Sequence, residues 1–583
     1  MILAAASVAV AGGVGTYLVL APNQTERILP ALPPVPEFSS EPEILQQKLR
    51  EAHATAATTG TLRSFADYAR LLQANGFASA ATQIWQVLIN ENSDDARWPY
   101  YLAHLRRDAG DTGETAQWLR RTVEINPDYS VAWLQLGDMA LKSANFDLAK
   151  TYYGERLNRV AGDPYARMGL ARIEHQEGNQ DAAQTQLLKL VDDHPNFASA
   201  HNLLARMYRD NGDIEQAELH RWQGYRAGRF IAAEDPWMEA LEDECYLPAK
   251  LFVIGMMDFQ ANRGDRGRST YERAVEYDPL DPGNHELLGD LYKRLKEPEL
   301  ARASLRRSLE LSAQQGSPPS LLATIHLAAV EREMFEFQSS RETAELGLTH
   351  HPKSPELFVE LGLTLSALTE TTPARDAFES AIKINPNDTA AHFHMGEWWL
   401  RKDETEEAIP HFEQSLVQQP TFAPSLRYLL QYTLGTDQLD RAKEHADTLL
   451  GAYYGDAEVR QLVAICYLRL GRRELQRGSV LNAIVPLQRA YQLDPEDVDI
   501  AFELGTLQLA QGNVKAAIPP LETLLEKRPE DARAHFFLAQ SYLMDGRPRA
   551  ARSLLEKGLE LAEAAGNSGT AANIREMLAA ISR

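Results

Sequence analysis

Apolar and small side chains recur with helical spacing along most of the chain, in units of 34 residues. In the unit 355–388, Leu361 and Leu365 share one helical face, and Ala374 and Phe378 share another further along. Apolar residues three or four places apart are typical of a helix with one buried face. Each unit is therefore predicted to form two helices.

The same unit starts at fourteen positions, which fall into four runs. The starts are 62, 96, 130, 164 and 198, then 248 and 282, then 321, 355, 389 and 423, and finally 464, 498 and 532. The eighth residue is Gly or Ala in thirteen of these units, and the residue twelve places later is small in all fourteen. Small side chains at both positions let two helix axes approach closely. Each unit is therefore predicted to be a tightly packed antiparallel pair.

Proline marks the end of the second helix in eight of the units, because its ring lacks the N–H that a helix interior requires. These residues are Pro127, Pro195, Pro279, Pro352, Pro386, Pro420, Pro495 and Pro529. Together with Gly362 and Ala374 in the unit 355–388, this pattern resembles the tetratricopeptide repeat. The resemblance covers residues 62–565. It implies an all-helical solenoid of stacked pairs with a concave face that binds other proteins.

The repeats are expected to fall into blocks separated by short interruptions. Residues 62–231 hold five repeats, 248–315 two, 321–456 four and 457–565 three, with an acidic insertion at 232–247. Residues 457–463 continue an apolar helical pattern and are expected to lengthen the helix that follows. Residues 566–583 are predicted to form a capping helix, since the open end of a repeat array needs a polar cover.

The first 21 residues are predicted to form a transmembrane anchor. Residues 2–21 carry no charge and are long enough to cross the hydrocarbon core of a bilayer. A cleaved signal peptide and a buried helix of the solenoid are the alternatives, although glycines at 12, 13 and 15 weaken a water-soluble helix. Residues 22–61 follow as a proline-rich linker and a capping helix. We expect a single-pass membrane protein of bacterial type, whose repeats face the periplasm.

Composition and motifs narrow the classes of function. The formal net charge of −23 argues against nucleic-acid binding through a general basic surface. Cys245 and Cys466 are the only cysteines and form no metal-binding motif. The sequence contains no motif of a metalloprotease, a serine hydrolase, a phosphate-binding loop or a dinucleotide fold. His392 and His394 alternate along a helix and point to different faces, which disfavours a metal site. We therefore expect no catalysis, no cofactor and no small-molecule substrate.

The fifth, ninth and twelfth residues of each unit face the concave side in the family that the repeats resemble. In the first five units, the ninth and twelfth positions carry a basic stripe, formed by Arg70, His104, Arg107, Arg172, His175, Arg206 and Arg209. From residue 389 onward, the fifth and twelfth positions carry an apolar stripe, formed by Phe393, Leu400, Leu434, Leu475, Phe502, Leu509, Phe536 and Leu543. The hypothesis is a partner groove that receives acidic groups in its first half and an apolar segment in its second. The alternative is that these residues only help one unit to pack on the next.

The insertion at 232–247 interrupts the repeats with six acidic residues around Trp237, Met238, Leu241 and Tyr246. Three interpretations are open. The insertion folds back over the basic stripe as an acidic plug, it docks a partner, or it forms a connecting helix whose apolar side covers the seam between two blocks.

The function expected from these patterns is a membrane-tethered scaffold that binds segments of other proteins in the concave groove. A soluble exported or cytoplasmic adaptor or co-chaperone is one alternative. A non-catalytic accessory subunit of an envelope-biosynthesis or secretion complex is another. Each of these uses the repeats in the same way, as a binding surface for protein partners.

Overall fold

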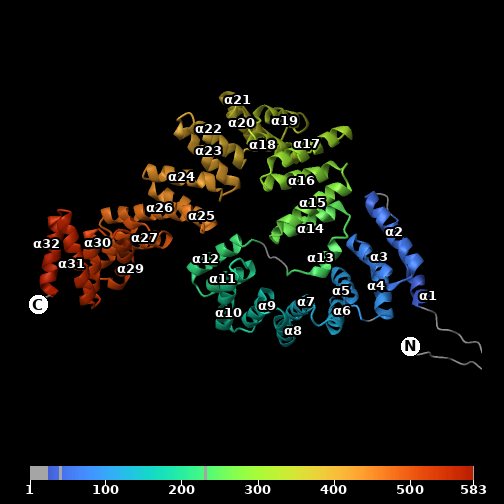
Figure 1. Cartoon of the computed structure of the whole chain (residues 1–583). Helices are drawn as coiled ribbons and strands as arrows, with labels where there is room; N and C mark the ends of the chain where they lie inside the picture. The colour runs from blue at the N-terminus through green and yellow to red at the C-terminus, as the bar shows by residue number, and fades with distance from the viewer. Residues whose placement is uncertain (1–23, 38–41, 93, 229–232, 582–583) are drawn as a thin grey trace, which may run out of the picture. The chain divides into compact units, whose positions relative to one another are not determined.

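The computed structural model describes residues 24–37, 42–92, 94–228 and 233–581, and these residues form 32 α-helices, one short 3-10 helix and no strand (Figure 1). Fourteen pairs of helices follow one another from α3 to α31, and the two helices of each pair pack against each other. The predicted all-helical repeat array is confirmed. The chain divides into two units, residues 1–350 and 351–583.

The first unit opens with α1 (Gln24–Ile28), η1 (Leu29–Ala31) and α2 (Glu43–Thr59), of which α2 packs on α3. Five pairs follow: α3 (Leu62–Ala74) with α4 (Ala78–Glu91), α5 (Arg97–Asp108) with α6 (Thr112–Ile125), α7 (Ser130–Lys142) with α8 (Phe146–Arg159), α9 (Pro164–Gln176) with α10 (Gln180–Asp193), and α11 (Ala198–Asp210) with α12 (Ile214–Arg226). The short α13 (Pro236–Glu242) interrupts the pairs. Three more come after it: α14 (Pro248–Gln260) with α15 (Gly264–Tyr277), α16 (Pro282–Arg294) with α17 (Pro298–Gln314), and α18 (Leu321–Glu333) with α19 (Phe337–His350).

The second unit contains six pairs and a final helix. The pairs are α20 (Pro355–Ala367) with α21 (Thr371–Ile384), α22 (Thr389–Leu400) with α23 (Thr405–Gln418), α24 (Ala423–Gly435) with α25 (Leu439–Tyr453), α26 (Ala457–Gln476) with α27 (Val480–Leu493), α28 (Val498–Ala510) with α29 (Val514–Lys527), and α30 (Ala532–Met544) with α31 (Pro548–Ala564). The last helix, α32 (Ser568–Ile581), packs on α31 and buries Ile574 completely. The apolar end of the last pair is thereby covered.

Helix boundaries agree with the repeat pattern. Twelve of the fourteen pairs begin at the first residue of a predicted unit, and α5 begins one residue later. The remaining helix, α26, begins at Ala457 because residues 457–463 extend it as expected. Each of the eight repeat-ending prolines lies two residues beyond the end of a helix, as Pro127 does after α6 and Pro195 after α10. Proline has therefore set these ends, since it supplies no N–H to the backbone ladder.

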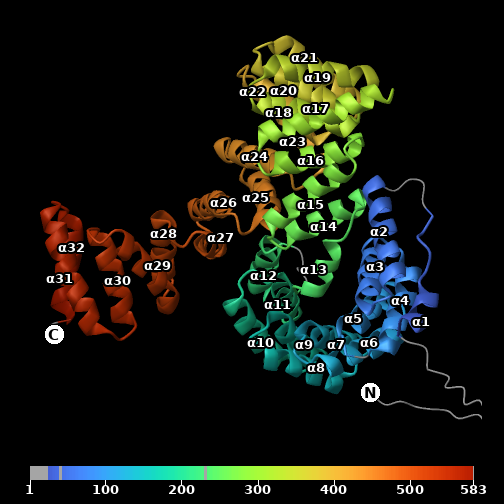
Figure 2. The ribbon, with the colours of Figure 1, turned by 45° about the vertical axis from the view of Figure 1, so that its right-hand side comes forward.

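The first five pairs form a curved row in the first unit. Figures 1 and 2 show α7, α9 and α11 on the inner side of this row and α8 and α10 on its outer side. The short helix α13 lies within the curve, against α3. The first helices of the pairs therefore present their exposed residues to the same inner face.

The close contact between pairs depends on missing side chains at two glycines. Tyr153 of α8 is fully buried, and its hydroxyl donates a hydrogen bond of 2.7 Å to Asp138. Its ring lies against Gly137 of α7 and Gly169 of α9, where an added Cβ would overlap the ring atoms. A single aromatic ring therefore fills the space that two successive units leave open.

Replacing Gly169 with alanine should destabilise α8 and α9 by about 1–3 kcal/mol, the usual cost of overpacking a filled core. Gly154→Ala is the matched control, because Gly154 lies inside α8 and an added Cβ there meets nothing within 4 Å. This control should be neutral or up to about 1 kcal/mol more stable, since alanine is the better helix former. Hydrogen exchange of the α8 and α9 amides measures the change in stability in each of the two variants. Equal protection in the two variants would contradict this packing role of Gly169.

The predicted transmembrane helix is corrected by the structure. Among residues 24–37, 42–92, 94–228 and 233–581, no helix is both long and apolar enough to cross a membrane. The longest of them, α26, has 20 residues but carries Arg469, Arg472 and Arg473, and a charged side chain at the centre of a bilayer is costly. Residues 1–21, where we predicted the anchor, lie outside the described residues. The single-pass anchor and the periplasmic location of the repeats are therefore not retained.

Candidate functional site

The acidic insertion lies on the inner face of the first unit and binds there through Asp235. One carboxylate oxygen of Asp235 accepts a hydrogen bond of 2.6 Å from the Tyr129 hydroxyl, and the other accepts one from the Tyr100 hydroxyl. Gln135 of α7 donates to the same hydroxyl of Tyr100 at 2.7 Å. Burial and the charge of Asp235 raise the pKa of both tyrosines, so both stay protonated and act as donors. Two phenols, one on α5 and one at the N-cap of α7, thus hold one carboxylate.

Trp237, two residues later, is held by the same tyrosines. Its indole is stacked on the ring of Tyr129, with 3.5 Å between centroids and 4° between planes, and meets Tyr100 edge to face. The backbone N–H of Trp237 donates to the Tyr129 hydroxyl at 3.3 Å, and its carbonyl accepts from Tyr101 at 3.3 Å. Side chain and backbone of this residue are therefore both bound, as in a peptide ligand.

The end of the insertion is fixed on α3. Glu244 makes an ion pair of 2.6 Å with Arg70, and its backbone carbonyl accepts a hydrogen bond of 2.9 Å from the Asn75 side chain. The oxygen of the Asn75 side chain accepts in turn from the backbone N–H of Tyr246 at 2.8 Å. Residues 235–246 therefore contact α3, α5 and α7, and we call them the bound segment.

Two residues of the basic stripe, Arg70 and His104, already contact the bound segment. Arg70 is paired with Glu244, and His104 is only 3% exposed and lies 3.9 Å from Asp235. Burial, followed by the charge of Arg107, lowers the pKa of His104 to about 3, so the ring is neutral. Neither residue offers a free positive charge to a partner.

The rest of the basic stripe is more exposed. Arg107 contacts the His104 ring at 2.8 Å, His175 is hydrogen-bonded to Gln180 at 2.7 Å, and Arg209 lies 3.8 Å from Glu218. Arg172 and Arg206 are exposed and form no hydrogen bond or ion pair within the part of the chain that the structure describes. Two free guanidinium groups thus remain on α9 and α11.

An open pocket of about 630 Å³ lies between α7, α9 and α11, with Arg172 in its wall. Tyr165 and Phe197 form an aromatic corner in it, with centroids 5.4 Å apart and rings 77° to each other. The charged residues of its wall are Arg172, Lys142 and Asp138. The other lining residues are Leu141, Ala144, Met168, Gly169, Gln176 and Ser199. This inner pocket therefore combines an apolar floor with a surplus of positive charge.

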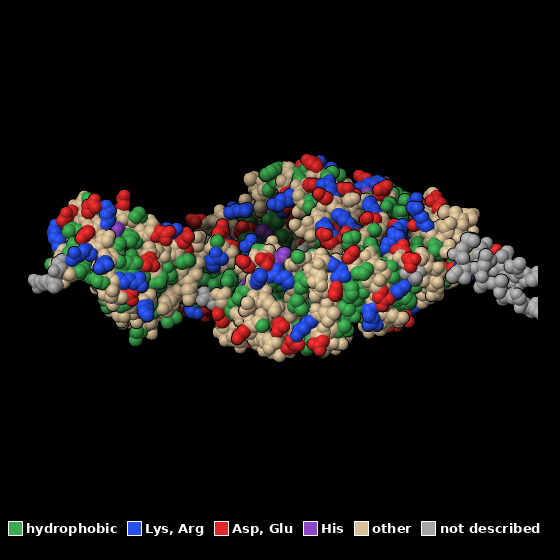
Figure 3. All heavy atoms as spheres, turned by 60° about the horizontal axis from the view of Figure 1, so that its bottom comes forward, with side chains coloured by type: hydrophobic (Ala, Val, Ile, Leu, Met, Phe, Trp, Pro, Cys, Tyr) green, Lys and Arg blue, Asp and Glu red, His purple; other side chains and the backbone are tan. Residues whose placement is uncertain are grey.

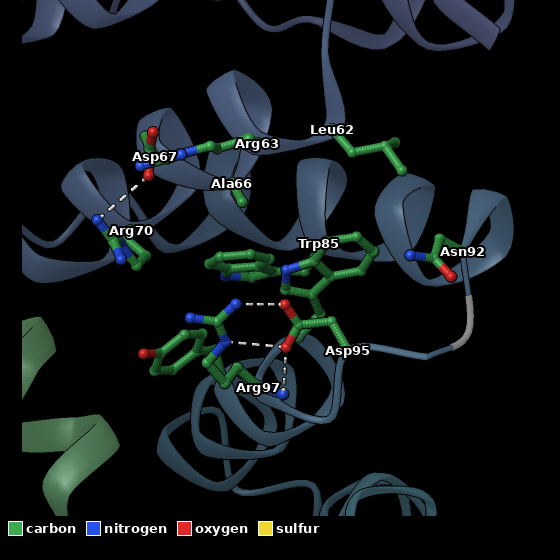
Figure 4. A pocket seen from close by; sticks show the side chains of 11 residues that line it. Leu62, Arg63, Ala66, Asp67, Arg70, Trp85, Asn92, Asp95 and Arg97 are labelled. Atoms are coloured by element: carbon green, nitrogen blue, oxygen red, sulfur yellow. Dashed lines mark hydrogen bonds and ion pairs between the residues drawn. The ribbon is translucent and has the colours of Figure 1, made fainter. Parts of the chain in front are cut away.

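A second pocket, of about 480 Å³, lies between α3 and α5 with Trp85 of α4 in its wall (Figure 4). Most of the charged side chains in its wall form ion pairs with other residues of this chain. Arg97 is paired with Asp95 at 2.5 Å, and Arg70 with Asp67 at 3.2 Å and with Glu244. Arg63 is the one cation of this wall without a partner in the described residues. The inner pocket on α7, α9 and α11 is therefore the better candidate for an anionic ligand.

The apolar stripe is part of the packing between helices. Leu434 and Leu509 are buried, each 6% exposed, and the other six side chains are half-buried and pack against hydrophobic clusters of the repeats. Phe393, for example, contacts the rings of Phe412 and Phe422 at 5.8 and 5.4 Å. These contacts favour the packing alternative for the apolar stripe.

Two important residues lie outside the sequence positions that we selected. Tyr129 and Phe197 each sit at the N-cap of a first helix, directly before the unit begins. Both follow a repeat-ending proline by two residues, in the pattern Pro-x-aromatic, which Phe422 shares. That pattern was a usable signal for residues that point to the inner face.

Neither the charges on one face of the molecule nor the metal-binding residue types of the described ranges indicate a second site. On the face drawn in Figure 3, acidic and basic side chains are interspersed and form no field of a single sign. No group of three or more His, Cys, Asp or Glu within the described ranges is placed to hold a metal ion. His392 and His394 do point to different partners, since His392 contacts His411 at 3.0 Å and His394 contacts Glu397 at 2.8 Å.

Comparison with known proteins identifies the repeat. The family model described as tetratricopeptide repeat matches residues 178–220, 255–316, 468–523 and 502–568. Tetratricopeptide repeat protein 21B of Mus musculus is 22% identical over 383 residues, which are 58% of this chain and 28% of that protein. Cellulose synthase operon protein C of Pseudomonas fluorescens is 26% identical over 247 residues, 38% of this chain and 18% of that protein. The chain thus spans less than a third of either relative's length.

Solved structures are similar at lower sequence identity. The structure of PilF from Pseudomonas aeruginosa is 18% identical and covers 37% of this chain and 97% of its own, with a TM-score of 0.30. The structure of yeast Tom70 is 15% identical and covers 74% of this chain and 98% of its own, with a TM-score of 0.29.

Proposed function

Since the chain carries tandem tetratricopeptide repeats, we propose that it is a protein-interaction scaffold whose inner face binds extended segments of partner proteins. The observation that carries the proposal is the bound segment itself. Asp235, Trp237 and Glu244 are held on α3, α5 and α7 through side chains and backbone, as a partner peptide would be. A surface that binds one peptide in this way is chemically suited to bind another.

The inner pocket on α7, α9 and α11 is the place for a partner, because the bound segment contacts α7 at its start, through Tyr129 and Gln135, and neither residue lines this pocket. The pocket is open and Arg172 lies in its wall, while Arg206 is exposed on α11, the helix to which Ser199 of the same wall belongs. Desolvated aromatic and arginine side chains are the residues that dominate binding energy at protein interfaces. We therefore expect Tyr165, Phe197 and Arg172 to contribute most to the free energy of partner binding.

A photo-reactive residue at the inner pocket should crosslink to partner proteins in cells that naturally express the chain. Gln176 lines the pocket and is exposed, so Gln176→p-benzoylphenylalanine places the probe there without removing a charge. We expect adducts of discrete mass, and we expect them to disappear when Arg172 and Arg206 are both changed to glutamate. Mass spectrometry of the adducts measures the result.

The same probe at Leu188 of α10 is the control, because this residue is 39% exposed on the outer side of the row. It should give no adduct of the same mass. Identical adducts from positions 176 and 188, or adducts that survive the double charge reversal, would count against partner binding on the inner face.

A further inference from the structure

The bound segment shows which chemical groups the inner face of these repeats accepts. A carboxylate, that of Asp235, lies between α5 and α7, and an aromatic ring, that of Trp237, is stacked on Tyr129 two residues later. Tyr129 is the residue directly before α7, and His104 of α5 lies beside the carboxylate. The unit of recognition is thus an acid followed, after one residue, by an aromatic side chain.

The inner pocket is the repeat equivalent of this occupied position. Phe197 lies two units of 34 residues after Tyr129 and has the same place directly before its helix. Arg172 lies two units after His104, and Met168 two units after Tyr100. All three of these later residues line the open pocket. The open pocket between α9 and α11 therefore has the same position in the repeat as the place that the bound segment fills between α5 and α7.

The substitutions between the two positions change how a carboxylate would be held. Met168 and Phe197 lack the hydroxyls with which Tyr100 and Tyr129 bind Asp235. Arg172 supplies instead an exposed guanidinium that forms no hydrogen bond or ion pair within the described residues, although its charge acts on Asp138 in the same wall, where the earlier unit has a buried neutral histidine. A guanidinium binds a carboxylate through charge-assisted hydrogen bonds, which are about twice as strong as neutral ones. The aromatic surface is kept, because Phe197 replaces one ring by another.

We propose that the inner pocket binds a partner segment in which an aspartate or glutamate stands two residues before an aromatic residue. Arg172 receives the carboxylate, and the aromatic side chain packs on Phe197 beside Tyr165. Lys142, also in the wall, favours further acidic residues in the same segment. This proposal rests on the proposed function and specifies the chemistry of the partner.

The test uses the full-length chain and a fluorescent peptide that copies residues 233–241, AEDPWMEAL, with blocked ends. We expect saturable binding, measured by fluorescence polarisation. Arg172→Glu should weaken this binding at least about tenfold, because one charge-assisted contact is lost and a repulsive one is gained. Phe197→Ala should weaken it as well, through loss of the stacking surface.

Arg120→Glu is the matched control, since Arg120 is exposed on α6 and free of partners in the described residues. It reverses the same charge and should leave the affinity unchanged. Two peptide variants, with the aspartate changed to asparagine or the tryptophan to alanine, test the proposal without altering the protein. Both should bind at least about tenfold more weakly.

The proposal is overturned if the parent peptide does not bind, if Arg172→Glu binds it as tightly as the parent chain does, or if either peptide variant retains full affinity. Circular dichroism identifies a variant that has lost its helices, and the peptide variants then decide the outcome. Crosslinks from position 176 without peptide binding would reject the acid-and-aromatic chemistry while the scaffold function stands. Peptide binding without crosslinks in cells would reject the scaffold function instead.

Discussion

Replacing Asp235 and Trp237 together with alanine will release the bound segment from α5 and α7. The double variant removes the carboxylate that Tyr100 and Tyr129 hold and the indole that is stacked on Tyr129. Hydrogen bonds to a charged group are worth about 1.5–3 kcal/mol, and loss of a half-buried indole adds to this. We expect the amides of residues 237–242 to exchange at least about 100-fold faster, because each factor of ten corresponds to about 1.4 kcal/mol.

Glu234→Ala is the control for this experiment. Glu234 is an exposed acid directly before Asp235 and has no hydrogen bond or ion pair with the described residues. Its loss should leave the exchange of residues 237–242 unchanged. If the double variant also leaves it unchanged, then the tyrosine contacts contribute little, and the ion pairs of Glu244 with Arg70, of Glu239 with Arg263 and of Glu242 with Arg266 hold the segment instead.

The helical architecture follows from the sequence because its determinants are local and repeated. Small residues at two positions of each unit, a proline after the second helix and a fixed spacing specify the pairs one by one. Even the early start of α26 could be predicted, since residues 457–463 keep the apolar spacing of a helix. Each of these signals can be recognised without knowing which distant residues contact the helix.

The inner face is harder to predict because it depends on contacts between distant residues. Tyr129 and Asp235 are 106 residues apart, and no periodicity relates a repeat to an insertion that binds it. His104 belongs to the predicted basic stripe, yet burial lowers the pKa of its ring and keeps the ring neutral. Leu509 belongs to the predicted apolar stripe on the concave face, yet it is buried, because α30 of the next helix pair packs in the same hydrophobic cluster. Position within the unit predicts which face a residue is on, but the partner of that face is set by tertiary structure.

The same limit applies to the choice of binding residues. Arg172 and Arg206 belong to a predicted stripe of seven, and only the tertiary contacts separate them from Arg70 and His104. Phe197 belongs to no predicted stripe, because the residue before the helix is not among the fifth, ninth and twelfth positions. The pocket forms where neighbouring repeats pack together. Its lining residues therefore cannot be predicted from the sequence of a single repeat.

Asp163→Ala should be the most destabilising single change in the first five pairs. Asp163 and Arg156 form an ion pair of 2.7 Å whose side chains are 3% and 9% exposed. The other oxygen of Asp163 accepts from the backbone N–H of Ala166 at 2.8 Å and so caps α9. Removing one partner of a buried ion pair costs about 3–5 kcal/mol, because the remaining charge has lost its compensation. Exchange of the α8 and α9 amides should accelerate at least about 100-fold.

The control is Asp193→Ala, which breaks the ion pair of 2.7 Å between Asp193 and Arg167, whose side chains are 46% and 19% exposed. An exposed pair contributes about 1 kcal/mol or less, so exchange should change by less than about fivefold. Asp163→Asn separates the two roles, since it keeps an oxygen for the Ala166 amide but loses the charge. Because α9 carries Arg172, Asp163→Ala should also abolish peptide binding at the inner pocket, whereas Asp193→Ala should preserve it. Equal exchange in both alanine variants would show that the buried pair does not anchor the helix on which that pocket depends.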